Sequence, residues 1–189
     1  FSPHDVPEMY EAFGMPEFDK MYVKAENDPT IKKTIVDART LVMDLLKERA
    51  ETGRIYIMNI DHCNTHSSFK DKVFMSNLCQ EITLPTKPIQ HIDDPDGEIA
   101  LCILSAVNVG NIKLEELEEL CDLSVRALEE IIDYQNYPVE AAEISTKARR
   151  SLGIGYIGLA HYLAKNKVKY EEKKALKLVD DIKEHFQYN

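Results

Sequence analysis

Three side chains suited to redox and acid–base chemistry stand at alternate positions within residues 76–84. Asn77, Cys79 and Glu81 supply an amide, a thiol and a carboxylate. In an extended chain these side chains would share one face, about 6.6 Å apart, because alternate residues point the same way. The amide could orient a ligand, the thiol could undergo redox chemistry and the carboxylate could act as a general base. An amphipathic strand with an incidental cysteine has the same spacing, so both interpretations stay open.

A second thiol, Cys102, lies in the apolar run Ile99–Val109. Buried cysteines are common, so a structural thiol is the default interpretation. Two strands flanking the turn-forming residues 91–97 would nevertheless bring Cys79 and Cys102 to the same end of a sheet. From the residues alone, the chain has a possible thiol and carboxylate site of undefined class.

The surrounding pattern predicts the elements that would position this site. Residues 1–16 are rich in proline and aromatic residues and are expected to be irregular. A helix is predicted from Thr30, as its N-cap, to Gly53, and further helices over 114–132, 139–165 (interrupted near Gly153) and 171–186, with a break at Pro138. Strands are predicted over 54–60, 74–84 and 99–109, and a loop over 61–72. The apolar run 99–109 is continuous, as in parallel sheets. Three strands cannot close a barrel, so we expect an α/β fragment with part of its sheet elsewhere.

Composition limits the class of protein. The 189 residues are 44% hydrophobic and 30% charged, as in an ordinary globular domain, and we expect one domain over residues 1–189. The net charge of −10 makes nucleic acid and anionic membranes improbable partners. The longest apolar stretch is about half of a membrane span. Four cysteines without CxxC spacing predict reduced thiols and a cytoplasmic location. The chain begins at Phe1 rather than Met, so we expect an internal piece of a longer protein.

The segments SNLCQEITLPTKP and GEIALCILSAVNVG resemble the central catalytic stretch of class I (aerobic) ribonucleotide reductase large subunits. FSPHDVP, TGRIYIMNIDHCNTH, IIDYQNYPVEAA and RRSLGIGYIGLAHYLAK match that family in order and spacing. The resemblance covers nearly the whole chain and fades only near its C-terminus. It implies part of a ten-stranded α/β barrel with flanking helices, in which residues 77–81 lie on a loop running up through the centre.

The resemblance also implies a role for each site residue. Cys79 would be the transient thiyl radical that removes the ribose 3′-hydrogen, Glu81 would take the 3′-hydroxyl proton, and Asn77 would hydrogen-bond the ribose hydroxyls. Cys102 would be half of the dithiol that reduces the 2′ carbon. The substrate would be a ribonucleoside diphosphate and the product a deoxyribonucleoside diphosphate, made for DNA synthesis.

The same resemblance implies partners outside this chain. The radical would come from a metal cofactor in a small subunit, and electrons from a dithiol reductant of the thioredoxin or glutaredoxin type. No cofactor is expected on this chain. The regulatory nucleotide-binding module, the allosteric site, the phosphate-binding loop and the second thiol of the pair are expected on other segments of the large subunit. We therefore expect the isolated chain to be inactive.

Two other classes stay open. An adenosylcobalamin-dependent relative would use similar chemistry, although the PTKP and IALC contexts favour class I. A non-catalytic fragment would keep the same residues without turnover. Cobalamin dependence of the full-length protein would separate the first of these from class I.

Three further signals are interpreted as structural. GIGYIG at residues 153–158 fits the dinucleotide fingerprint, but a helix-like segment precedes it, so close backbone packing is favoured. His62, Cys63 and His66 lack a fourth ligand for structural zinc, so we predict a polar loop and no metal site. Cys121 lies on the apolar face of its helix and is expected in the core.

Overall fold

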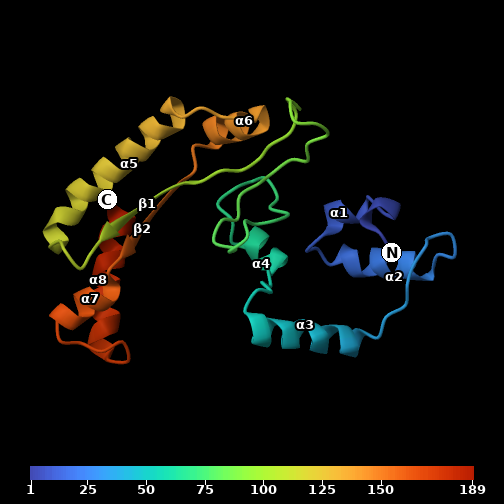
Figure 1. Cartoon of the computed structure of the whole chain (residues 1–189), viewed down its shortest axis with the longest axis horizontal. Coiled ribbons are helices and arrows are strands. Elements are labelled where there is room, and N and C mark those ends of the chain that lie inside the picture. The colour runs from blue at the N-terminus through green and yellow to red at the C-terminus, as the bar shows by residue number, and fades with distance from the viewer. The chain divides into compact units, whose positions relative to one another are not determined.

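The computed structural model describes residues 1–189, which divide into two compact units, residues 1–86 and residues 87–189 (Figure 1). The first unit is helical, and the second combines helices with a two-stranded parallel sheet. The expectation of one domain over the whole chain stays a prediction. No helix combines the length and the apolar character that a membrane span requires.

The first unit contains one 3-10 helix and four α-helices. They are η1 (Pro3–Asp5), α1 (Met9–Ala12), α2 (Glu17–Asn27), α3 (Ala38–Thr52) and α4 (Ile60–Thr65). The prediction that residues 1–16 are irregular is wrong in part, because η1 and α1 lie there. Their apolar side chains pack on α2, and Val6, Met9 and Ala25 are buried together. This packing explains why such short helices form next to three prolines.

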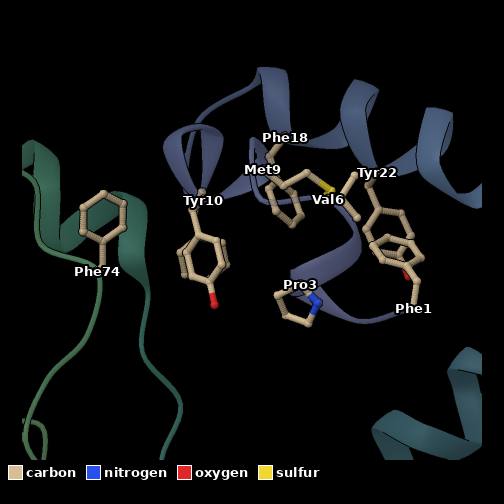
Figure 2. A pocket seen from close by; sticks show the side chains of 9 residues that line it. Phe1, Pro3, Val6, Met9, Tyr10, Phe18, Tyr22 and Phe74 are labelled. Atoms are coloured by element: carbon tan, nitrogen blue, oxygen red, sulfur yellow. The ribbon is translucent and has the colours of Figure 1, made fainter. Parts of the chain in front are cut away.

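Aromatic side chains around this core line a pocket of about 380 Å³ (Figure 2). Phe1 and Tyr22 lie with their ring centroids 5.1 Å apart, and Phe18 lies 6.2 Å from Tyr22. Phe74, from the segment after α4, lines the same pocket. The lining is apolar apart from the tyrosine hydroxyls, so this pocket offers a packing surface and no acid, base or thiol.

Helix α3 begins later than the sequence predicted. Its N-cap is Asp37, whose carboxylate accepts a hydrogen bond of 2.8 Å from the backbone N–H three residues on. Thr30, the predicted cap, instead donates through its backbone N–H (2.8 Å) and its hydroxyl (2.6 Å) to Asp28. Thr30 is thus engaged in the turn that closes α2. The predicted end is confirmed, because Gly53 adopts a left-handed φ of 66° there.

The predicted strand over residues 54–60 is wrong, and so is part of the predicted loop over 61–72. Residues 54–59 pair with no strand, and α4 starts at Ile60. Asn64 of α4 explains how the polar HCNTH segment is held. Its amide accepts from the backbone N–H of Val73 at 2.8 Å and donates to the Val73 carbonyl at 2.9 Å. This side chain therefore pairs with the backbone as a neighbouring strand would.

The second unit contains two strands, four α-helices and one 3-10 helix. They are β1 (Ile103–Asn108), η2 (Leu114–Glu116), α5 (Leu117–Tyr134), α6 (Glu140–Arg149), β2 (Leu152–Ile157), α7 (Leu159–Lys165) and α8 (Lys173–Tyr188). Strand β1 pairs in parallel with β2, from Ile103 opposite Leu152 to Asn108 opposite Ile157. The prediction of a parallel strand in residues 99–109 is confirmed over its C-terminal part, residues 103–108. The helices predicted over residues 114–132 and 171–186 are confirmed as α5 and α8.

Helix α5 covers one face of this sheet (Figure 1). Its buried side chains are Leu117, Cys121, Leu128 and Ile132. The expectation that Cys121 is a core residue is confirmed, since only 4% of it is exposed. On β1, Val107 is buried, whereas Leu104 and Ala106 are exposed. Because alternate strand residues point to opposite faces, β1 has one covered face and one open face.

The prediction of an interrupted helix over residues 139–165 is wrong in its centre. Helix α6 ends at Arg149, the left-handed Arg150 (φ 48°) follows, and β2 then runs through the glycine-rich segment. Gly158, with a φ of 78°, precedes α7. Glycine is a poor helix former, and the paired neighbour β1 makes the extended conformation available here.

Candidate active site

The loop between Val73 and Pro85 carries the three predicted site residues of the first unit. Val73 is 1% exposed and is held by both backbone hydrogen bonds to Asn64. Pro85 is fully buried. The loop is therefore fixed at both ends, and its exposed central residues form a tip.

A turn forms the tip of this loop, so the fully extended segment predicted over residues 74–84 is wrong at its centre. The Asn77 carbonyl accepts the N–H of Gln80 at 3.1 Å. The Asn77 side-chain oxygen accepts the N–H of Ile82 at 2.9 Å. Gln80 has a φ of 63°, the left-handed conformation that a tight turn uses. Asparagine is favoured in turns because its side chain can bond to the backbone a few residues on.

Asn77, Cys79 and Glu81 are all exposed at this tip. All three residues belong to this turn and its ends rather than to one face of a strand. The side-chain oxygen of Asn77 holds the turn, which leaves its amide NH₂ group as the hydrogen-bond donor toward a ligand. The tip thus presents a donor, a thiol and a carboxylate from one short, anchored segment.

Cys102 lies in the second unit, one residue before β1. It is half-buried, and burial raises the pKa of its thiol, so this thiol stays protonated at neutral pH. By alternation it shares the open face of β1 with Leu104 and Ala106. A Cβ atom built on Gly153 of β2 would lie 3.2 Å from the Cys102 Sγ. The glycine therefore leaves room for the sulfur beside the second strand.

Asn77, Cys79 and Glu81 belong to the first unit, residues 1–86, and Cys102 belongs to the second unit, residues 87–189. The predicted proximity of Cys79 and Cys102 stays a prediction.

Two sequence signals outside this site have structural explanations. His62 and Cys63 lie on α4, where a loop was predicted, and His66 is the C-cap of that helix. The two imidazole rings are 6.1 Å apart. No group of three or more His, Cys, Asp or Glu side chains is arranged to hold a metal ion. The GIGYIG segment forms β2 itself rather than the turn after a strand that the dinucleotide fingerprint requires.

Glu98, a carboxylate that is 8% exposed, was not among the residues predicted from the sequence. Glu98 pairs with Lys87, Nζ to Oε1 at 2.5 Å, and with the guanidinium of Arg149. The sequence signal that could have indicated Glu98 is an acidic residue placed directly before the apolar run 99–109. The partner arginine lies 51 residues away in sequence, so no local pattern indicates it.

The structure thus combines a parallel strand pair with flanking helices, an exposed thiol on an anchored loop and a second, protonated thiol next to a strand. The family model described as "Ribonucleotide reductase, barrel domain" matches residues 1–189. The chain therefore belongs to the ribonucleotide reductase family, within the barrel domain of the class I large subunit. The expected family and its mixed helix and sheet fold are thus confirmed.

Relatives from this family match the chain over its whole length. The alpha subunit of ribonucleoside-diphosphate reductase from Haemophilus influenzae is 57% identical over all of this chain and 26% of its own length. That from Buchnera aphidicola of Schizaphis graminum is 53% identical over 25% of its length. The alpha subunit of ribonucleoside-diphosphate reductase 1 from Escherichia coli K12 is 50% identical over 26% of its length. The chain thus spans about a quarter of these relatives.

Proposed function

We propose that this chain is the part of a ribonucleoside-diphosphate reductase large subunit that carries the radical cysteine and one reducing cysteine. The observation that carries the proposal is the loop tip, which presents Cys79 between Asn77 and Glu81 in a chain that matches the reductase barrel domain throughout. The substrate is a ribonucleoside diphosphate, as the names of the relatives state for those proteins.

The reaction begins at Cys79. Its thiyl radical takes the hydrogen atom from C3′ of the ribose, which leaves a thiol on the protein and a radical on the sugar. Glu81 accepts the proton of the 3′-hydroxyl, and the NH₂ group of Asn77 donates a hydrogen bond to the ribose. An exposed tip suits these roles, because all three groups must reach the sugar together.

Cys102 supplies the reducing equivalents with a second thiol, which the family resemblance assigns to another segment of the large subunit. One thiol protonates the departing 2′-hydroxyl, which leaves as water. The pair then gives two electrons and a second proton to the sugar and becomes a disulfide. The raised pKa of Cys102 favours protonation of the leaving group, because the thiol keeps the proton that it must donate. Glu81 returns its proton to the 3′-oxygen, and Cys79 finally returns its hydrogen atom to C3′ and becomes a thiyl radical again.

Two further components complete the cycle. A small subunit with a metal cofactor supplies the radical to Cys79, since one-electron chemistry of this kind is provided by cofactors. A thioredoxin- or glutaredoxin-type dithiol reduces the disulfide by exchange. These partners follow from the family resemblance.

The proposal is tested by exchanging this chain for the matching segment of the 57% identical alpha subunit. The chimera is assayed with its small subunit and reductant for deoxyribonucleoside diphosphate formation. We expect activity in the chimera, no product with Cys79→Ser, and a fall of about 10²-fold or more in kcat with Glu81→Gln, the size of a general-base effect.

Cys63→Ser is the matched control, because Cys63 is a half-buried thiol on α4 without a role in the proposal. It should retain the turnover of the chimera. Unchanged turnover with Cys79→Ser or Glu81→Gln would overturn the proposed roles, and a folded chimera without any activity would favour the non-catalytic alternative.

A further inference from the structure

A buried carboxylate with two cationic partners lies just before Cys102 in the chain. Glu98 is 8% exposed and accepts from Lys87 at 2.5 Å and from the guanidinium of Arg149. The backbones of Lys87 and Glu98 also pair, with two hydrogen bonds of 3.1 Å in an antiparallel bridge. Glu98 is thus fixed by both its side chain and its backbone.

This carboxylate is ionised at neutral pH. Burial by itself would raise the pKa of Glu98, but the hydrogen bonds and charges of Lys87 and Arg149 outweigh that effect and lower it. Such a cluster is a poor source of stability, because apolar residues of similar volume often stabilise a fold as well or better. The geometry that the ion pairs fix is therefore the more informative property.

The Glu98 ion pairs are connected through α6 to the segment that carries Cys102. The segment from Glu98 to Cys102 runs beside this helix. The N–H of Ile99 donates to the carbonyl of Ala141 at 3.1 Å, and the N–H of Ile103 donates to that of Ser151 at 3.2 Å. Arg149 lies in the last turn of α6, two residues before Ser151. Its bond to Glu98 therefore ties the segment that carries Cys102 to the helix beside it.

We propose that Glu98 is a positioning residue that holds Cys102 in register with β2 through Arg149 and α6. This inference rests on the proposed function of Cys102. Thiol delivery to the 2′ position depends on the place of the sulfur, and a displacement of about 1 Å can cost about 100-fold in rate. When that delivery is slow, the sugar radical formed at C3′ decays and releases the free base instead of product.

The test measures the ratio of free base to deoxynucleotide formed by the active chimera. A smaller amount of folded enzyme lowers both products equally and leaves this ratio unchanged, so the ratio separates positioning from loss of fold. The test variant is Glu98→Gln. Lys87→Met serves as a second variant, because Lys87 is 61% exposed and its replacement should be tolerated by the fold.

Glu143→Gln is the matched control. It removes a carboxylate from α6, the helix that carries Arg149, at an exposed pair with Lys147 (2.7 Å). Cys102→Ser is the reference for complete loss of thiol delivery.

We expect Glu98→Gln to raise the ratio by about tenfold, Lys87→Met to raise it less, and Glu143→Gln to leave it unchanged. The inference is overturned if Glu98→Gln gives the same ratio of free base to deoxynucleotide as the parent chimera, while Cys102→Ser still releases base. If Glu98→Gln does not fold, the same result in Lys87→Met overturns it. Normal turnover of Cys102→Ser without base release would overturn the proposed function itself.

Discussion

The Sγ of Cys102 lies against Gly153 of the neighbouring strand, where a Cβ atom would approach it to 3.2 Å. The same Cβ atom would lie 2.5 Å from Cδ2 of Leu104. Two strands that are distant in sequence therefore meet at the candidate reducing thiol, and the absence of a side chain on one of them leaves space for the sulfur on the other.

Gly153→Ala should disturb this contact. Leu104 is 59% exposed and its side chain can rotate away, but the sulfur of Cys102 is half-buried and has less room. We expect unfolding free energy to fall by about 1 kcal/mol or more, as for other overpacked sites. Gly155→Ala is the control, since nothing lies within 4 Å of its Cβ position. Equal urea midpoints for the two variants would contradict the packing argument.

Glu98 should give the chain an acid-sensitive contribution to stability. Its folded-state pKa is lowered below the unfolded value of about 4.3, so the contribution is complete above about pH 4.3 and lost as pH falls through the folded-state pKa. We expect Glu98→Gln to reduce unfolding free energy by about 2 kcal/mol at neutral pH, less than for a fully buried pair, because Lys87 is partly solvated.

The measurement is urea unfolding of parent and Glu98→Gln at about pH 7 and about pH 3. The gap between the two should narrow at the lower pH, because below about pH 4.3 the unfolded chain binds a proton at Glu98 more readily than the folded chain does. A gap that stays constant over this range would show that the carboxylate is not ionised in the folded chain.

The four thiols should react with iodoacetamide in the order of their exposure. Cys79 is exposed, whereas Cys121 is 4% exposed and burial raises the pKa of its thiol. We expect Cys121 to be alkylated at least about tenfold more slowly than Cys79 in the folded chain, since the thiolate is the reactive form. Peptide mass spectrometry over time gives both rates. In urea the rates should converge, and equal rates in the folded chain would contradict the burial described here.

The elements that were predicted well carry their signal locally. The apolar face of α5 repeats with the helical period, and the apolar run that contains β1 is long enough to identify as a strand. Strand β2 was missed because GIGYIG has weak local preference and is extended through pairing with β1, whose partner residues lie 49 positions earlier in the chain. Residues 54–59 show the reverse case, in which a β-rich sequence has no strand to pair with.

The local geometry of the candidate site differs from the sequence prediction, and the choice of its residues stays a prediction. The alternation of Asn77, Cys79 and Glu81 suggested one strand face, whereas all three belong to a turn closed by the Asn77 side chain and to its ends. Their chemical roles came from the family resemblance rather than from spacing. Glu98 was missed because its partner Arg149 becomes a neighbour only in the folded chain.

The most direct test of the central claim follows the C3′–H bond itself. The claim is that Cys79 removes this hydrogen, and serine cannot replace it because a hydroxyl O–H bond is too strong to give up its hydrogen and form the radical that starts the reaction. Chimeras with Cys79→Ser or Cys102→Ser are given 3′-deuterated substrate, and radical loss and base release are followed. We predict that Cys79→Ser shows neither event and makes no product, whereas Cys102→Ser loses the radical with a deuterium isotope effect and releases base. Turnover, radical loss or base release by Cys79→Ser would contradict the claim.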